Sequence, residues 1–256
     1  MRATLAIARR ELEQYFATPM GWLCLCGFVL VTGFFFALMT TDYSVQASQS
    51  AFNPYMQEEM NVNDWLVQPF FANTAVILLL LCPALSMRLF AEDRRQRSLE
   101  LLLSSPIGSG QIVLGKYLGA LGFLTIVKSL TLFMPALVEI NGKVSWSQIG
   151  AGYLGLFALG AAVVAIGTFA STVSRNQLLA AVLGGSIVGV LILAWLLSRV
   201  SDPPLKDVFA YMALFDKHFQ PFMRGRINTE SLVYYASVSF GFLLLATRAL
   251  KARRWV

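Results

Sequence analysis

Few residues of this chain have the types and spacing of a catalytic or ligand-binding motif. The pattern that comes nearest is a group of glycines followed by a lysine. Residues 110–116 read GQIVLGK, which follows the spacing of a phosphate-binding P-loop. The next position should be Ser or Thr to hold Mg²⁺, but it is Tyr117, and the stretch leads into an apolar run instead of following a buried strand. We therefore expect no nucleotide site here. We interpret Gly115 as a close helix contact and Lys116 as a cation that reaches lipid phosphates.

Other catalytic patterns are missing from the sequence. The single histidine, His218, has no Cys or carboxylate cluster at metal-ligand spacing. The three cysteines lie inside apolar runs, where small apolar packing is their simplest role: Cys24, Cys26 and Cys82. No nucleophile elbow occurs, and the apolar runs lack Asp and Glu. The sequence therefore argues against an intramembrane protease and against a carrier with a buried carboxylate relay.

Lys128 is the one charged residue near the middle of an apolar run. A cation at mid-membrane costs about 2.5–3.5 kcal/mol and faces protein or water. Two interpretations stay open at this stage. Either Lys128 lies on a substrate path, or it faces a water-filled bundle interior or a partner subunit.

The amino-acid composition predicts that these residues are carried by membrane-spanning helices. Of 256 residues, 57% are hydrophobic and 13% are charged, with a mean hydropathy of +0.64. A soluble domain has about 25% charged residues, so the composition predicts an integral membrane protein. Because about 20 apolar residues cross a bilayer, the sequence predicts six spans, near residues 20–40, 70–89, 117–138, 149–170, 178–197 and 232–250.

The positions of the basic residues predict the orientation. Thirteen of the twenty Lys and Arg residues fall in the termini and the alternate loops on their side, and six fall in the other loops. The first loop on that second side contains four carboxylates and no base: Asp42, Glu58, Glu59 and Asp64. The positive-inside rule therefore predicts that both termini are cytoplasmic. The loop at 199–230 carries five bases, and at that length we expect it to have structure of its own.

The chain begins with a segment that resembles an amphipathic helix. In residues 3–16, Leu5, Leu12, Tyr15 and Phe16 fall near one face, with charged residues near the other. Thr18-Pro19 should break this helix before the first span, which favours a helix over residues 1–18 lying in the membrane interface. A cleavable signal peptide is the weaker interpretation, because the apolar run is too long and lacks a small-residue cleavage site.

The segment at residues 88–115 is the one that discriminates between functions. It continues the second span as a charged helix, and SLELLL at 98–103 then forms a short amphipathic turn that is stopped by Pro106. Such a loop presents both signs of charge and a compact apolar knob. A membrane subunit needs this kind of surface in order to dock into a cleft of a soluble partner.

At these residues the sequence resembles the permease subunits of type-2 ABC transporters, especially the gliding-motility branch and the permeases of copper-enzyme maturation. Matching elements are REL at 10–12, YF at 15–16, TP at 18–19, GFFF at 33–36, MRLFAEDR at 87–94, SLELLLSSP at 98–106, IVLGK at 112–116, RGRI at 224–227, YY at 234–235 and RRW at 253–255. One departure is Arg97-Ser98, where the family often has Gly-Thr or Gly-Ser.

The resemblance implies a fold and an assembly. The fold is an all-α integral membrane domain over residues 1–256, with six transmembrane helices and an N-terminal interfacial elbow helix, the type-2 ABC exporter permease fold. The protomer would pair with a second permease, identical or different, and with a dimer of ATPase subunits that hold ATP and Mg²⁺. This chain would hold no cofactor. It would lie in the inner membrane, contact lipids and an extracytoplasmic auxiliary protein, and bind no nucleic acid.

The resemblance also assigns roles to residues. The elbow helix at 1–18 would use Arg10, Glu11 and Tyr15. The coupling helix at 91–108 would contact the ATPase through Glu92, Asp93, Arg94, Arg95, Arg97, Glu100, Ser105 and Pro106. The extracytoplasmic loop at 199–230 would form two short helices that cap the pathway with Phe209, Met212, Phe215, Phe219 and Phe222, and Lys128 would be a candidate pathway residue.

The resulting prediction is a permease that couples ATP hydrolysis on a separate subunit to export or to mechanical signalling across the membrane. Its apolar spans are compatible with lipids, peptides, polysaccharide or force transmission as the cargo. The alternative is a non-transporting membrane scaffold that anchors soluble partners. An intramembrane enzyme ranks third, because the residues for its chemistry are missing.

Overall fold

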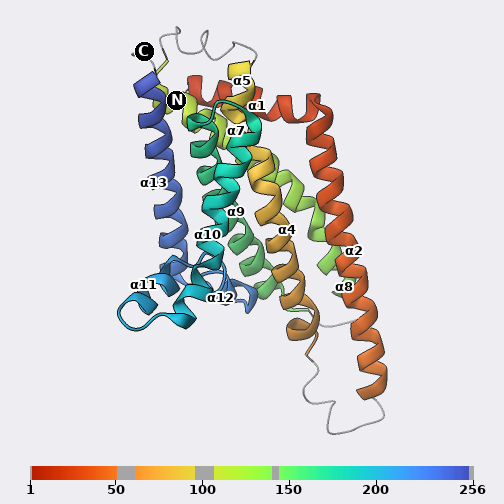
Figure 1. The fold of residues 1–256 in the computed structure, drawn as a ribbon. Helices are drawn as coiled ribbons and strands as arrows, with labels where there is room; N and C mark the ends of the chain where they lie inside the picture. The colour runs from red at the N-terminus through yellow and green to blue at the C-terminus, as the bar shows by residue number, and fades with distance from the viewer. Residues whose placement is uncertain (1, 51–60, 96–106, 140–143, 254–256) are drawn as a thin grey trace.

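The computed structural model describes residues 2–50, 61–95, 107–139 and 144–253, and these ranges fold as helices without a strand (Figure 1). Six helices in these ranges are long and apolar enough to cross a membrane, which confirms the predicted number of spans. They are Pro19–Ser48, Asn63–Arg95, Ser109–Glu139, Trp146–Val173, Gln177–Val200 and Thr229–Ala252. All six overlap the predicted runs.

The elements follow in simple order along the chain. They are α1 (Arg2–Ala17), α2 (Pro19–Ser50), the π-helix η1 (Asn63–Val67), α4 (Gln68–Ser86), α5 (Arg88–Arg95), α7 (Ser109–Ser129), the 3₁₀-helix η2 (Leu130–Leu132), α8 (Phe133–Glu139), α9 (Trp146–Val173), α10 (Gln177–Val200), α11 (Leu205–Met212), α12 (Gln220–Met223) and α13 (Thr229–Arg253).

Both chain ends lie at one end of the bundle, together with α5, and α1 runs across that end (Figure 1). The short helices α11 and α12 lie at the opposite end (Figure 1). We refer to these as the terminus end and the loop end. The two short helices lie within residues 199–230, where a structured loop was expected.

A sharp corner joins α1 to α2, where the sequence predicts a helix break. The Thr18 hydroxyl donates to the carbonyl of Gln14, 3.1 Å away, and Pro19 begins the next helix, a position where its missing N–H costs nothing. Gly21 lies directly against the carbonyl of Tyr15, so any side chain there would collide with backbone. The corner therefore accommodates a proline at position 19 and leaves no room for a side chain at position 21.

The third span begins at Ser109, earlier than predicted, because Gly108 forms its N-cap. Gly108 is extended, and its N–H donates to the Gln111 side chain 3.3 Å away. The whole glycine and lysine pattern thus lies inside α7. A P-loop needs an irregular loop around the phosphates, whereas these residues are helical.

Helix α9 forms the centre of the bundle. Within its most apolar window 78% of residues are buried, against 17% for α2 and 22% each for α10 and α13. Glycines let its neighbours approach: a Cβ at Gly155 would lie 2.6 Å from the Cβ of Phe222 in α12, and one at Gly152 would collide with the Phe71 ring of α4. Helices α2, α10 and α13 surround this core and expose large apolar side chains outward.

Candidate functional site

A buried ionic cluster joins three elements at the terminus end. The Lys116 ammonium of α7 lies 2.8 Å from Glu11 Oε2 of α1 and 2.7 Å from Asp93 Oδ2 of α5. The three residues are only 3%, 6% and 4% exposed. Lys116 Nζ also lies 5.5 Å from the centre of the Phe90 ring. We call Glu11, Asp93 and Lys116 the ionic junction.

The ionic junction corrects the interpretation of Lys116 as a cation that reaches lipid phosphates. Lys116 is buried between two carboxylates, because the elbow helix covers the start of α7. Burial raises the pKa of the Glu11 carboxyl above its ordinary value, while the nearby Lys116 charge acts in the opposite direction. Such a cluster holds its elements in one arrangement and becomes costly when a single member is lost.

Glycine allows α1 to come this close to α7. A Cβ at Gly115 would lie 2.8 Å from Ile7 Cβ, and one at Gly119 would lie 2.6 Å from Glu11 Cβ. The pair has GxxxG spacing and forms a close helix contact, the role that the sequence suggested for Gly115. Its partner is the elbow helix of the same chain, so this pair is already occupied within the protomer.

Arg88 forms a second link between the elbow region and α5. Its Nη1 donates to the Thr18 hydroxyl at 3.0 Å, its Nε lies 3.3 Å from Glu92 Oε2, and its guanidinium stacks 4.7 Å above the Tyr15 ring. The Tyr15 hydroxyl donates to the carbonyl of Leu85 at 2.9 Å. Both elbow residues Glu11 and Tyr15 are therefore internal, whereas Arg10 is exposed.

Helix α5 is also bound to the end of α9. Arg94 donates to the carbonyl of Thr172 at 3.0 Å and to the carbonyl of Ser174. The Ser171 hydroxyl donates to the carbonyl of Met87 and accepts from the N–H of Phe90, at 2.8 and 3.0 Å. These bonds satisfy carbonyls that the end of a helix leaves open. Helix α5 is thus held against α1, α7 and α9 together.

The structure describes four of the eight predicted coupling residues. Asp93 and Arg94 face inward and hold α5 in place, Glu92 is partly buried, and Arg95 is exposed. The other four, Arg97, Glu100, Ser105 and Pro106, lie outside the described residues. A contact of this segment with an ATPase stays a prediction, and Arg95 is the described residue with a side chain open to such a contact.

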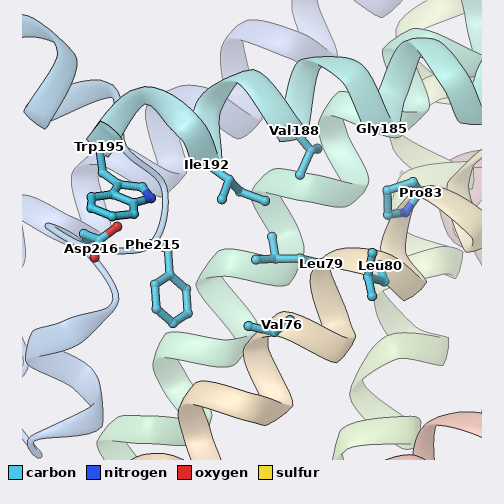
Figure 2. A pocket seen from close by; sticks show the side chains of 11 residues that line it. Val76, Leu79, Leu80, Pro83, Gly185, Val188, Ile192, Trp195, Phe215 and Asp216 are labelled. Atoms are coloured by element: carbon cyan, nitrogen blue, oxygen red, sulfur yellow. The ribbon is translucent and has the colours of Figure 1, made fainter. Parts of the chain in front are cut away.

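A groove of about 390 Å³ lies between α4 and α10. Its walls are apolar, with Val76, Leu79 and Leu80 on α4 and Val188, Ile192 and Trp195 on α10 among them. Figure 2 shows Trp195 beside Asp216 at one end of the groove and Pro83 toward the other. The sequence does not predict this groove, although Pro83 inside its span and the four-residue spacing from Gly185 to Gly189 mark two of its walls.

Lys128 does not line this groove. It is 4% exposed, and its Nζ lies 4.7 Å from the centre of the Phe157 ring of α9. Within the described ranges no carboxylate forms an ion pair with it. An aromatic face thus shelters the cation, and a role on a transport path stays a prediction.

The loop end is closed by an aromatic cluster. His218 stacks on Tyr234 with ring centres 3.9 Å apart, and its Nε2 lies 3.0 Å from the carbonyl oxygen of Tyr211. The hydroxyls of Tyr234 and Tyr235 donate to the carbonyls of Met212 and Leu214. Of the predicted cap residues, two are fully buried and three are not: the first are Phe219 and Phe222, the others Phe209, Met212 and Phe215. The aromatic residues thus fix the segment to α13.

We expect acid to weaken this cluster. Burial lowers the pKa of His218 below its ordinary value, so the fold favours the neutral ring. The stability that this provides is complete above the ordinary pKa, about 6.5, and is lost as the pH falls from there through the lower pKa of the folded state. Lowering the pH from about 7.5 to about 5.5 should therefore speed proteolysis of residues 199–230. In His218→Phe this acceleration should disappear, because His218 is the only histidine of the chain; an equal acceleration in the variant contradicts the assignment.

No three His, Cys, Asp or Glu side chains of the described ranges are grouped as metal ligands.

A family model described as ABC-2 family transporter protein matches residues 5–237, which is most of the chain. A search of curated proteins finds none that matches significantly. The family match agrees with six apolar helices and no strand in the described ranges. The chain belongs to the ABC-2 family of transporter proteins and is a multi-pass membrane permease component of an ABC transporter.

Proposed function

We propose that two copies of this permease, or this chain and a related one, pair in the inner membrane and are driven by a separate ABC ATPase dimer. ATP and Mg²⁺ bind the ATPase subunits. Both termini face the cytoplasm, because the basic residues concentrate on their side. The terminus end, which carries α5, is then the end that the ATPase can reach.

The observation that carries the proposal is the groove between α4 and α10. It is apolar and lies between two spans, and α10 is covered by its own protomer over only a small part of its surface. A Cβ at Gly185 or Gly189 would meet nothing within 4 Å. Small residues on such a face let a second helix approach closely. We infer that the second protomer closes the groove and that the enclosed space is the transport path.

The bonds of α5 suggest how the ATPase acts on this path. Helix α5 follows directly on α4, one wall of the groove, and its residues are bonded to α9 and to the ionic junction. A push on the segment after Arg95 would therefore move α4 and α1 together. Alternating access by such a rigid-body movement is the usual behaviour of transporters. The loop end would close the outer side of the path.

The apolar lining of the groove indicates the chemical class of the cargo. Aliphatic and aromatic walls suit an apolar chain, such as a lipid tail or an apolar peptide. By resemblance to the gliding-motility branch, the same movement could transmit force to an extracytoplasmic auxiliary protein instead of passing a substrate.

Substituting the groove glycines tests the pairing. Gly185→Leu combined with Gly189→Leu should leave the protomer folded, because open space surrounds both positions, and should abolish the dimer seen by native mass spectrometry in detergent. Gly241→Leu on α13, a position that is equally open, is the matched control and should keep the dimer. A dimer that survives the double substitution contradicts the proposed interface.

A second measurement tests the function itself. The ATPase that co-purifies with this chain should hydrolyse ATP faster when the wild-type permease is present, and the double leucine variant should lose that stimulation. Reversal of charge at the exposed Arg95, Arg95→Glu, should weaken the stimulation without affecting the dimer. If hydrolysis does not depend on the permease at all, the chain is a scaffold and the proposal is wrong.

A further inference from the structure

A second cavity, of about 310 Å³, lies at the terminus end, between the α1–α2 corner, α5 and the start of α10. Its lining includes Thr18, Met20, Arg88, Glu92, Arg95 and Gln177. We call it the Arg88 cavity. Unlike the groove between α4 and α10, it combines apolar walls with charged side chains. Arg95, in its lining, is also the residue proposed to contact the ATPase, whereas Arg88 and Gln177 have no part in the proposed transport cycle.

Arg88, which lines the cavity, has one hydrogen-bond donor that is unused within the described residues. Arg88 is 6% exposed; its Nη1 donates to Thr18 and its Nε faces Glu92, both of which line the cavity. Its Nη2 is buried and has no hydrogen-bond partner in the part of the chain that the structure describes. Buried polar groups normally find a partner, and an unsatisfied charged donor is costly. Arg88 therefore brings to the cavity a charge whose hydrogen-bonding capacity is not fully used.

The electrostatics of the cavity favour an anion. Its lining carries two arginines, Arg88 and Arg95, against one carboxylate, Glu92. The 24-residue helix α10 begins at the cavity with Gln177, so its positive end contributes as well. The Asn176 side chain accepts from the N–H of Leu179. A helix start leaves its first N–H groups without partners inside the helix, and in α10 this bond satisfies one of them.

The depth of the cavity identifies the source of the anion. Three apolar spans begin or end at its lining: the first starts at Pro19, the second ends at Arg95 and the fifth starts at Gln177. The cavity therefore lies where lipid headgroups meet the hydrocarbon. Trp22, 53% exposed, is close to the same boundary, as aromatic residues at membrane interfaces are.

We propose that the Arg88 cavity binds the phosphate of an anionic phospholipid. The planar guanidinium groups match phosphate oxygens, the start of α10 adds backbone donors, and the apolar Met20 and Met87 border the path of the acyl chains. A lipid bound here would touch the α1–α2 corner and α5 at once. It would thus stabilise the α1–α2 corner and the adjoining end of the elbow helix.

The test compares lipid and soluble phosphate on the purified full-length chain in detergent. Phosphatidylglycerol should raise the unfolding temperature of the wild type, and phosphatidylcholine should do so much less. Arg95→Gln should weaken the apparent affinity for phosphatidylglycerol about tenfold, as expected for the loss of one charge-assisted hydrogen bond. Arg95 is exposed and makes no described contact that holds the fold, so this variant should remain folded.

Arg175→Gln is the matched control, because Arg175 is exposed next to the start of α10 but does not line the cavity. It should keep the affinity of the wild type. Equal binding by wild type and Arg95→Gln, or equal weakening by Arg175→Gln, overturns the proposal. If inorganic phosphate alone stabilises the wild type and Arg95→Gln abolishes that effect, the phosphate chemistry stands and the lipid source is wrong. None of these measurements involves an ATPase, so their outcome is independent of the proposed transport function.

Discussion

Lys116→Met is expected to destabilise the protein strongly, by about 3–5 kcal/mol, which is the cost of breaking a buried ion pair by removing one partner. The substitution leaves Glu11 and Asp93 facing each other in a buried site with no cation between them. The measurement is thermal unfolding of the purified protein, where a shift of about 10 °C corresponds to this change. Protease sensitivity of α1 should increase in parallel, because the elbow helix loses its attachment to α7.

Two further variants separate loss of the pair from loss of a lysine. Lys251→Met, at an exposed position of α13, should have almost no effect. The triple variant with Glu11→Gln, Asp93→Asn and Lys116→Gln replaces charges by amides that can bond to one another, and it should recover most of the lost stability. If the triple variant is as unstable as Lys116→Met, the ionic junction is not the cause.

The instability of Lys116→Met should also depend on pH. Burial already raises the pKa of Glu11, and loss of Lys116 removes a charge that opposes the rise. A carboxyl with a raised pKa in the fold favours the folded state below its unfolded pKa and opposes it as the pH increases through the folded value. Lys116→Met should therefore regain stability as the pH falls toward about 4.5. A variant that loses stability on acidification would contradict this reasoning.

The second large effect is expected from Gly155→Leu in the central helix α9. A Cβ at this position lies 2.6 Å from Phe222 Cβ and 2.8 Å from Phe222 Cγ, and the first of these atoms cannot rotate away. Overpacking of a dense core costs about 1–3 kcal/mol, and the leucine must displace α12 from α9. Hydrogen exchange in α12 should rise, although Gln148 still donates to the carbonyl of Met223 at 2.7 Å.

Gly150→Leu provides the matched control for this substitution. Gly150 lies on the same helix, and an added Cβ meets nothing within 4 Å, so this leucine should be tolerated. Combining Gly155→Leu with Phe222→Ala creates room and should restore part of the stability, and the double-mutant cycle measures the coupling. Equal effects of the two glycine substitutions would show that the contact with Phe222 does not decide the outcome.

The spans were predictable from sequence because membrane crossing depends on a local property, about 20 apolar residues in a row. The elbow helix and its break at Thr18-Pro19 were predictable for the same reason. The partners of Lys116 were not, because Glu11 lies 105 residues away and no periodicity carries such a distance. The available signal was the four-residue spacing from Glu11 to Tyr15, which places both on one face of α1.

Arg94 shows a related limit. A charged helix that leaves the membrane suggests a solvent-exposed docking surface, and that interpretation included both Asp93 and Arg94. In the structure Arg94 donates to carbonyls at the end of α9, and Asp93 pairs with Lys116. The last carbonyl groups of a helix lack partners inside that helix, so a nearby arginine can turn toward the protein and donate hydrogen bonds to them. Sequence alone does not show which helix ends there.

The ionic junction has a consequence for biosynthesis. The ribosome completes Glu11 well before Lys116, which follows 105 residues later. At about 5–20 residues per second this interval is roughly 5–20 s. Throughout it the nascent elbow helix has neither the glycine surface of α7 nor its cation, so Glu11 stays in contact with water at the bilayer surface. Docking of α1 onto α7 can therefore follow only after the third span has been synthesised.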